Sequence, residues 1–288
     1  MNVKKLGLKG LLLLGVTALV IQGFAKFDQN PKEKFIGIQL YSVRDDMNKD
    51  PKGTVAKVGE MGYKFVETAG YTDGQFYGMT PVEFKALCEA NGMEFFGSHT
   101  GQNVPTKETW DQTMAWWDKA IDAHAAAGVK WIVQPWMNEV GYNSLDGLKQ
   151  YAAYFNAVGE KCNAKGIKFG YHNHEKEFTT EFEGKPLYDW MLELTDPDKV
   201  MFELDLYWIN VGGKSATVYF DKYPGRFMLW HIKDQKELGA SGEMDFNSIF
   251  DQKEKAGLKY GIVEVEEYDF TPLESVKKSF DFMQTTNY

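Results

Sequence analysis

The stretch Ala127-Gly-Val-Lys-Trp-Ile-Val-Gln134 predicts the end of a helix, a glycine turn and a buried strand. Glycine directly after a helix adopts the left-handed conformation that closes the last turn, and the chain then enters a strand. The same order of glycine, apolar residue, charged residue and apolar run occurs four more times. These stretches are Met61-Gly-Tyr-Lys-Phe-Val-Glu67, Asn91-Gly-Met-Glu-Phe-Phe-Gly-Ser98, Lys165-Gly-Ile-Lys-Phe-Gly-Tyr171 and Ala256-Gly-Leu-Lys-Tyr-Gly-Ile-Val-Glu264. The repetition predicts a series of helix-to-strand units.

Three more apolar runs complete the set of predicted strands: Phe35-Ile-Gly-Ile-Gln-Leu-Tyr41, Val200-Met-Phe-Glu-Leu204 and Phe227-Met-Leu-Trp-His231. Successive runs are spaced by about 30 residues, the length of one strand-helix unit. Their nearly continuous apolar character is typical of a parallel sheet covered on both faces. We therefore predict an α/β fold of the (β/α)8 TIM-barrel type. An open doubly wound sheet is the runner-up, but no Gly-x-Gly-x-x-Gly follows the first run.

Helical periodicity, with apolar residues three and four positions apart, lies between the predicted strands. The predicted helices cover residues 81–91, 110–127, 146–165, 186–194, 215–223, 246–256 and 271–283. No linker of low complexity interrupts the chain, so residues 26–288 are predicted to form one domain.

The composition excludes one class of partner. The 288 residues carry a formal net charge of -9, whereas a nucleic-acid partner would require a clustered Lys/Arg surface. The many aromatic residues suit a large core and also suit stacking against sugars. A small-molecule partner is therefore favoured, and the sequence leaves a homo-oligomer open.

The first 25 residues have the features of a secretory signal peptide. Three lysines, Lys4, Lys5 and Lys9, precede the apolar residues 11–21, and Gly23-Phe-Ala25 supplies small residues for cleavage. An uncleaved membrane anchor is the alternative, but the apolar run is short for a spanning helix. We predict a secreted or periplasmic protein that has no stable membrane insertion after cleavage.

Cys88 and Cys162 are the two cysteines of the chain. Each lies in its own predicted helix at a matching position, two units apart, so close approach of the two sulfur atoms is not expected. We predict two separate buried thiols.

Polar residues gather where the predicted strands end. Asp205, His231 and Glu264 end three consecutive apolar runs, and this combination of side chains suits a divalent metal. The C-terminal ends of barrel strands are also where such enzymes place their chemistry. The other strand-end residues are Gln39, Ser42, Glu67, Ser98, His99, Gln134, His172, Asn173, His174, Glu175, Glu177, Glu203, Lys233, Asp234 and Glu266.

Alternation along a strand places Glu203 with Asp205, His231 with Lys233, and Glu264 with Glu266 on common faces. Taken singly, each residue has an ordinary structural explanation, such as an exposed ion pair between Lys233 and Asp234. Taken together, the cluster indicates a functional site.

Five stretches resemble the sugar phosphate isomerase/epimerase superfamily, which has a xylose isomerase-like TIM barrel. They are Gly37-Ile-Gln-Leu-Tyr-Ser42, Gly170-Tyr-His-Asn-His-Glu-Lys-Glu-Phe178, Glu203-Leu-Asp-Leu-Tyr-Trp208, His231-Ile-Lys-Asp234 and Ile262-Val-Glu-Val-Glu266. The resemblance covers essentially the whole chain after the predicted signal peptide. It implies one divalent metal ion, Mn²⁺, Mg²⁺, Co²⁺ or Zn²⁺, held by two glutamates, an aspartate and a histidine.

The resemblance puts Asp205, His231 and Glu264 on three of the four ligand positions. The fourth is a departure, because Gly170 matches the glutamate that the epimerases carry at the end of the fifth strand. Glu177 is the favoured substitute, with His172 or His174 as the alternative. The departure brings the chain nearer to the inosose dehydratase-like branch.

The chemistry that the resemblance implies is proton abstraction next to a sugar carbonyl through an enediolate. Glu264 would be ligand and base, His174 or Glu177 the second proton carrier, and Lys233 the group that holds a developing oxyanion. Trp208, Trp136 and Tyr41 would wall the sugar. The residues predicted to bind substrate are Gln39, Glu67, His99, Gln134, His172 and Trp208.

The predicted function is that of a metal-dependent sugar isomerase or epimerase. The first alternative is a lyase or hydro-lyase acting on an oxidised (keto) sugar or keto-glycoside, and the second is a sugar-binding module without catalysis. A nuclease is disfavoured, because a trinuclear zinc site needs more histidines and the chain is acidic.

Overall fold

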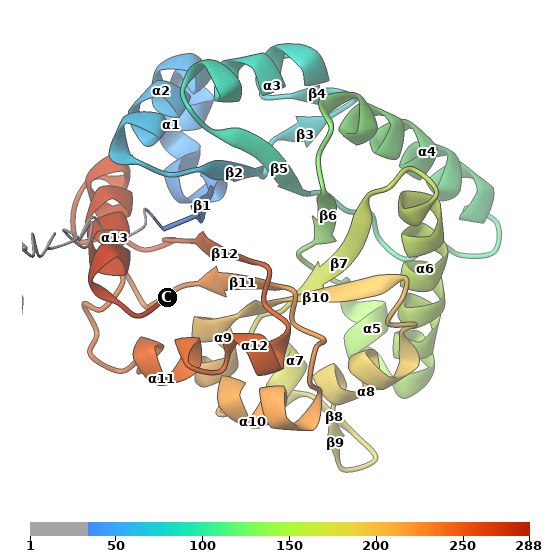
Figure 1. Ribbon diagram of the computed structural model, residues 1–288. Helices are drawn as coiled ribbons and strands as arrows, with labels where there is room; N and C mark the ends of the chain where they lie inside the picture. The colour runs from blue at the N-terminus through green and yellow to red at the C-terminus, as the bar shows by residue number, and fades with distance from the viewer. Residues whose placement is uncertain (1–33) are drawn as a thin grey trace, which may run out of the picture. The chain divides into compact units, whose positions relative to one another are not determined.

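The computed structural model describes residues 34–288, and in this part of the chain eight parallel strands close into a barrel (Figure 1). In chain order the barrel strands are β1 (Ile36–Gln39), β2 (Phe65–Thr68), β5 (Glu94–His99), β6 (Trp131–Gln134), β7 (Lys168–His172), β10 (Val200–Asp205), β11 (Leu229–Ile232) and β12 (Tyr260–Val263). Each strand pairs with the next, and β12 pairs with β1. The predicted barrel and all eight predicted strands are confirmed.

The helices form a ring around the barrel (Figure 1). The ring consists of α2 (Pro51–Met61), α3 (Pro81–Ala90), α4 (Trp110–Ala127), α6 (Leu145–Asn163), α8 (Leu187–Leu194), α10 (Ala216–Lys222), α11 (Phe246–Phe250), α12 (Lys253–Ala256) and α13 (Pro272–Thr285). The glycines of the repeated stretch have the expected backbone: Gly128 ends α4 at a φ of 74° and Gly62 ends α2 at 108°. The predicted helix over residues 246–256 is divided into α11 and α12, with Asp251 and Gln252 between them.

Several short helices and hairpins lie in the loops that follow the strands. They are η1 (Leu40–Val43), α1 (Arg44–Lys49), α5 (Glu139–Asn143), α7 (Lys176–Thr179), α9 (Leu206–Val211) and two hairpins, β3 (Tyr71–Thr72) with β4 (Gln75–Phe76) and β8 (Glu181–Phe182) with β9 (Lys185–Pro186). These elements are too short to show the apolar periodicity by which the longer ring helices were predicted.

The interior of the barrel has an apolar half and a polar half. Strand residues alone form the apolar part, a cluster made of Phe65, Phe96, Trp131, Val133, Met201, Leu229 and Ile262. Towards the C-terminal ends of the strands the inward positions become charged, beginning with Glu67 and Glu203, which are fully buried. Because the inward side chains change from apolar to charged along the barrel axis, the candidate site lies towards the C-terminal ends of the strands.

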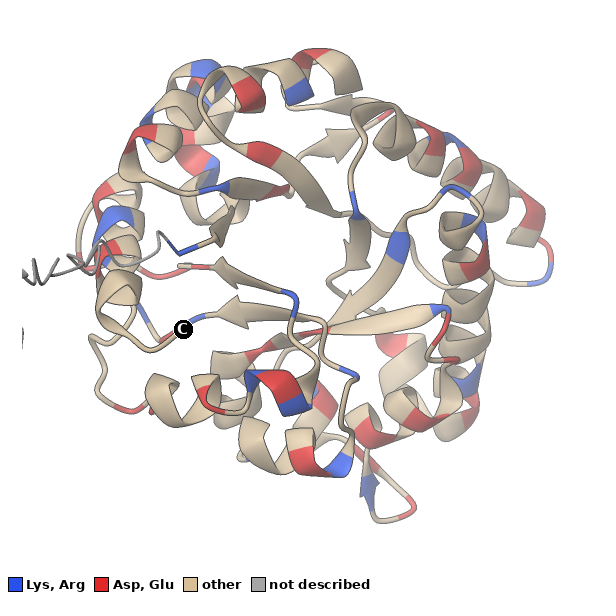
Figure 2. Cartoon of the chain, in the orientation of Figure 1, with Lys and Arg blue, Asp and Glu red and all other residues tan. Residues whose placement is uncertain are grey.

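Outside the barrel, Lys and Arg are interspersed with Asp and Glu around the helical ring (Figure 2). Cys88 in α3 and Cys162 in α6 are both buried and unpaired, as predicted. The predicted signal peptide and cleavage site lie outside the described residues and stay predictions. Among residues 34–288, no helix is long and apolar enough to cross a membrane.

Candidate active site

Glu67 on β2 is the deepest carboxylate in the barrel. Its Oε1 accepts a hydrogen bond from the indole of Trp131 at 2.6 Å, and its Oε2 accepts one from the amide of Gln39 at 2.8 Å. The Nε2 of His231 lies 2.9 Å from the same Oε2. Burial alone would raise the pKa of Glu67, but His99 and His231 hold it well below its usual value. Glu67 is therefore a fixed anion at the floor of the polar half.

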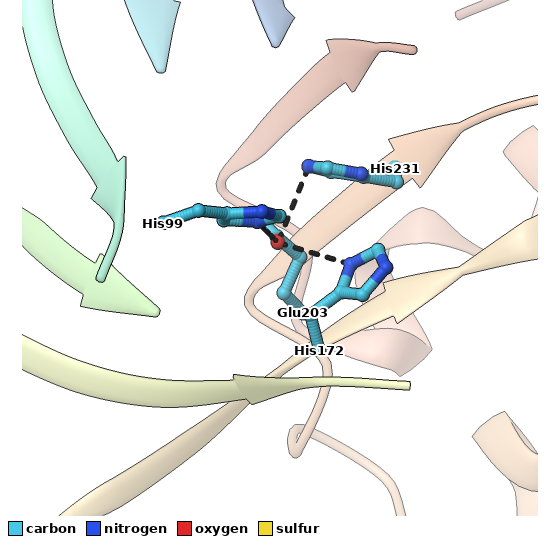
Figure 3. A group of neighbouring side chains, drawn as sticks. All are labelled: His99, His172, Glu203 and His231. Carbon is cyan, nitrogen blue, oxygen red and sulfur yellow. Dashed lines mark hydrogen bonds and ion pairs between the residues drawn. The ribbon is translucent and has the colours of Figure 1, made fainter. Parts of the chain in front are cut away.

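Glu203 on β10 lies beside three imidazoles (Figure 3). Its Oε2 is 2.7 Å from Nε2 of His99, 3.2 Å from Nδ1 of His172 and 3.2 Å from Nε2 of His231. We call His99, His172, Glu203 and His231 the lower group. Its four donor atoms lie within 4.8 Å of one another, which is close enough for a metal ion.

A second set of four residues, the upper group, lies at the strand ends and consists of His172, Asp205, His231 and Glu264. Their donor atoms also lie within 4.8 Å of one another. The Nε2 of His172 is 3.9 Å from Oδ2 of Asp205, and the Nδ1 of His231 is 3.0 Å from Oε2 of Glu264. His172 and His231 therefore offer one ring nitrogen to each group.

The two carboxylate oxygens of Asp205, in the upper group, differ in their hydrogen bonds. Its Oδ1 accepts hydrogen bonds from the backbone N–H groups of Tyr207 and Trp208 at 2.9 and 2.8 Å, and so caps α9. Its Oδ2 is buried and has no hydrogen-bond partner among the described residues. A buried carboxylate oxygen without a partner is costly unless a ligand satisfies it. The upper group, with two nitrogens and two carboxylates, therefore fits a divalent metal.

Glu203 also has a buried oxygen, Oε1, without a partner among the described residues, but the lower group fits a supporting role better. Oε2 of Glu203 already has imidazole partners, and a metal-binding histidine normally presents its other ring nitrogen to a carboxylate. With the upper nitrogens of His172 and His231 on a metal, the lower nitrogens face Glu203 and Glu67. The lower carboxylates thus orient both imidazoles.

The pKa shifts agree with a surplus of buried negative charge. Burial raises the pKa of Asp205 to about 8, although Lys233 opposes the shift, and burial together with Glu67 raises the pKa of Glu203 to about 7. Burial lowers the pKa of His172 well below its usual value, and neighbouring imidazoles add to this effect, which favours the neutral imidazole that binds a metal. Burial alone would also lower the pKa of His231, but Glu203 and Glu264 raise it well above its usual value, so His231 must release a proton to bind a metal.

Lys233 on the strand-end segment after β11 is a buried cation beside the upper group. Its Nζ is 3.4 Å from Oε2 of Glu264 and forms an ion pair with Glu266. Burial alone would lower the pKa of Lys233, but the carboxylates of Glu264, Asp205 and Glu266 raise it above its ordinary value. The side chain stays charged at neutral pH.

The upper group opens to solvent through a cavity of about 280 Å³. His99, His172, His174 and Glu264 line its inner part, and the half-exposed rings of Tyr41 and Trp136 lie at its rim. Trp208 contacts the ring of His174 at a centroid distance of 5.8 Å. We call this space the inner cavity.

Glu177, the favoured fourth ligand in the sequence, lies outside both groups. Its Oε1 accepts hydrogen bonds from Tyr142 and Tyr171, and its Oε2 accepts one from the backbone N–H of His174 at 2.9 Å. The prediction that Glu177 is the fourth ligand stays a prediction, and the geometry favours His172, the alternative from the same segment. Glu177 instead holds the loop that carries His174.

The structure brings the other predicted residues to the site, with one exception. Gln39, Glu67, His99, His172 and Lys233 surround the upper and lower groups through the contacts described above. Gln134 lies to one side, where its amide donates to the carbonyl of Trp136 at 2.9 Å and its Oε1 accepts from Gln102. Gln134 therefore supports the Trp136 loop.

Gly170 lies in the apolar half, two residues before His172. A Cβ at this position would lie 2.9 Å from the Cγ of Met201, so a larger side chain would need Met201 to move. Glu203 was placed on the same face as Asp205 by alternation, but the sequence assigned it no role. Its position beneath three histidines is a result of the fold.

A closed parallel barrel with a carboxylate-histidine cluster at the C-terminal mouth has the arrangement in which TIM-barrel enzymes place their active sites. The sequence profile of the xylose isomerase-like TIM barrel family matches residues 55–286, and the chain belongs to this family. This is a superfamily of enzymes that includes isomerases, epimerases and a dehydratase.

Three proteins illustrate the similarity. A crystal structure described as a sugar phosphate isomerase/epimerase from Parabacteroides distasonis is 33% identical, with a TM-score of 0.82 over 88% of this chain and 99% of that one. Inosose dehydratase from Lacticaseibacillus casei is 25% identical over 239 residues, 76% of this chain and 74% of the relative. A 3-keto-D-glucoside 4-epimerase from E. coli has a TM-score of 0.67 at 17% identity over 88% of this chain and 100% of that one, which shows the shared fold alone.

Proposed function

We propose that the protein is a metal-dependent sugar isomerase or epimerase that removes a proton next to a carbonyl. The observation that carries the proposal is the upper group, in which the partnerless Oδ2 of Asp205 meets His172, His231 and Glu264 at the mouth of the barrel. A divalent metal bound there would act as a Lewis acid towards the carbonyl oxygen of the sugar.

Three side chains would carry the proton chemistry. Glu264 lines the inner cavity, and its pKa is held well below its usual value by Lys233 and His231 although burial opposes this, so it is ionised, which is the state that a general base requires. The positive charges that lower its pKa also make it a weaker base. His174 lines the same cavity from the loop after β7 and is the second proton carrier. Lys233 supplies a fixed positive charge where negative charge develops on the substrate oxygen.

The test of the reaction is solvent exchange. The protein loaded with Mn²⁺ is incubated in D₂O with a panel of neutral keto-sugars, and the products are identified by NMR. Deuterium at a carbon next to the carbonyl, together with a changed stereocentre or a moved carbonyl, supports the proposal. A panel without any exchange in the presence of bound metal would contradict it.

Metal removal is expected to destabilise the protein. At a free metal concentration 100-fold above Kd, binding to the native state adds about 2.7 kcal/mol, or roughly 5 °C or more in Tm for a domain of this size. Differential scanning calorimetry with Mn²⁺, Mg²⁺, Co²⁺ or Zn²⁺, and again with excess EDTA, measures the shift. Equal Tm values in all conditions would show that the upper group binds none of these ions.

A His174→Gln substitution is expected to separate proton removal from product formation. Glu264 and the upper group remain, so exchange of the substrate C–H proton with D₂O continues. Turnover falls by about 10²–10⁴-fold, because the second proton transfer loses its carrier. The comparison of exchange rate with turnover measures the effect, and metal affinity serves as the internal control. A parallel loss of exchange would give His174 the role assigned to Glu264.

A hydro-lyase acting on a keto-sugar is the second candidate. Two features favour it: the sequence resemblance matches Gly170 to the glutamate of the epimerases, and the chain is 25% identical to an inosose dehydratase over 239 residues. In this version Glu264 removes the proton and His174 protonates a departing hydroxyl group. Release of water, with formation of an unsaturated product absorbing in the ultraviolet, distinguishes it from an epimerase.

A further inference from the structure

A second cavity of about 590 Å³ adjoins the inner cavity. Both cavities are lined by Tyr41 and Ala69, so the second space is adjacent to the inner cavity. We call it the outer cavity. It lies between α1 and the β3–β4 hairpin, two elements that follow the first two barrel strands. Because the two spaces share this boundary, a ligand that passes Tyr41 would contact both of them.

The boundary between the cavities is held firmly. The guanidinium of Arg44 lies 4.6 Å from the centre of the Tyr41 ring and donates to the Tyr41 carbonyl at 3.2 Å and to the hydroxyl of Tyr268 at 2.7 Å. Tyr41 is 42% exposed, and its ring is therefore a fixed aromatic surface open to a ligand. Aromatic faces of this kind suit the C–H faces of a sugar ring.

The opposite wall is also preorganised. In the β3–β4 hairpin, the hydroxyl of Tyr77 accepts the backbone N–H of Ala69 at 3.1 Å, and the Tyr77 ring packs on Phe84 at 5.6 Å. A Cβ on Gly70 would lie 2.4 Å from the Tyr77 ring, so only glycine allows this close approach. The hairpin holds Asp73 and Gln75 at the outer cavity.

The polar lining of the outer cavity suits hydroxyl groups. Asn48 and Gln75 offer amides, and within residues 34–288 no hydrogen bond engages either side chain. Asp45 and Asp73 add carboxylates. Amides and carboxylates bind neutral sugars through their hydroxyl groups.

A phosphate group is a poor match for either cavity. A phosphate normally requires Lys or Arg side chains or the N-terminus of a helix. Among the described residues, Arg44 is the one Lys or Arg that lines the two cavities, and Tyr41, Tyr268 and the carbonyl of Glu266 accept hydrogen bonds from three of its five N–H groups. The first turn of α1 carries Asp45 and Asp46, which repel an anion.

We propose that the outer cavity is a binding site for a second, neutral sugar ring, and that the substrate is a glycoside such as a disaccharide rather than a sugar phosphate. The reacting ring lies in the inner cavity over the upper group, the linkage passes Tyr41, and the second ring contacts Asn48 and Gln75. This inference rests on the proposed function for the identity of the reacting ring.

The test compares ligand classes on the full chain loaded with Mn²⁺. Isothermal titration calorimetry is performed with cellobiose, lactose, maltose and sucrose, with glucose, galactose and fructose, and with glucose 6-phosphate and fructose 6-phosphate. At least one disaccharide should bind 10-fold or more tightly than its own monosaccharides and than both phosphates. Tighter binding of a sugar phosphate, or no binding of any disaccharide, overturns the proposal.

Variants locate the binding. Gln75→Ala and Asn48→Ala should each weaken disaccharide binding by about 3- to 10-fold, the loss of one neutral hydrogen bond, and leave monosaccharide binding unchanged. Gln112→Ala, an exposed glutamine on α4 outside both cavities, is the matched control. Equal affinities in all three variants would show that the outer cavity does not hold the ligand.

The same samples separate this inference from the proposed function. If deuterium exchanges into a monosaccharide keto-sugar and disaccharides show no preference in binding, the proposed reaction is supported and the outer binding site is contradicted. If disaccharide binding depends on Gln75 but no keto-sugar or keto-disaccharide exchanges, the outer binding site is supported and the proposed reaction is contradicted.

Discussion

Asp205→Asn should lower divalent metal affinity by more than about 100-fold, because even loss of an outer partner of a ligand costs about 10- to 100-fold. The amide retains an oxygen that can cap α9, so the helix start is preserved while the charge that a cation requires is removed. Solvent exchange and turnover should fall with the metal. Chelator competition and elemental analysis of the purified variant measure the loss.

Asp221→Asn is the matched control, since Asp221 lies on α10, outside both groups, and forms an exposed ion pair with Lys255. Its metal affinity should equal that of the parent protein. If Asp205→Asn bound metal as tightly as the control, the upper group would be the wrong place for the ion. If the parent protein bound both metal and sugar but catalysed no solvent exchange, the protein would be a sugar-binding module without catalysis.

Glu264→Gln is expected to produce the largest loss in rate. The substitution removes the only strand-end carboxylate that both belongs to the upper group and lines the inner cavity within the described residues. General-base catalysis contributes about 10²–10⁴-fold, and solvent deuterium exchange should fall by at least this factor. Exchange is measured at saturating metal, so that weaker ligation by the amide is separated from loss of the base.

Glu267→Gln provides the comparison, because Glu267 is an exposed glutamate three residues further on that lines neither cavity. Its exchange rate should match the parent. A Glu264→Gln variant that exchanged at the parent rate with metal bound would transfer the role of base to another residue. His174 would then be the first to examine, since its own variant separates exchange from turnover.

Much of the fold could be predicted because its signals are local. Each glycine after a helix closes that helix by its own backbone conformation, and the apolar strands follow directly. The start of the ring helix α2 also has a recognisable sequence pattern: Asp50 is the N-cap, whose side chain accepts a hydrogen bond from the backbone N–H of Gly53, and Pro51 is the first helical residue. The break between α11 and α12 has no such pattern, because the apolar periodicity continues through residues 246–256.

The site was predicted less completely than the fold. Alternation along β10 put Glu203 on the face of Asp205 but left open whether that face points into the barrel or away from it. The role of Glu203 did not follow from the sequence either, because His99, His172 and His231 come from three other strands and only barrel closure brings them within 3.2 Å of its Oε2.

The sequence by itself determined the strands, the presence of Asp205, His231 and Glu264 at strand ends, and the end of the barrel at which they meet, because these follow from periodicity and from residue chemistry. Only the tertiary structure distinguished the surroundings of His172 from those of Glu177. Tyr142 and Tyr171 occupy the Glu177 carboxylate, whereas His172 ends its strand facing inward. The tertiary structure also placed α1 and the β3–β4 hairpin beside the mouth, since the relative position of two loops depends on the packing of the elements that carry them.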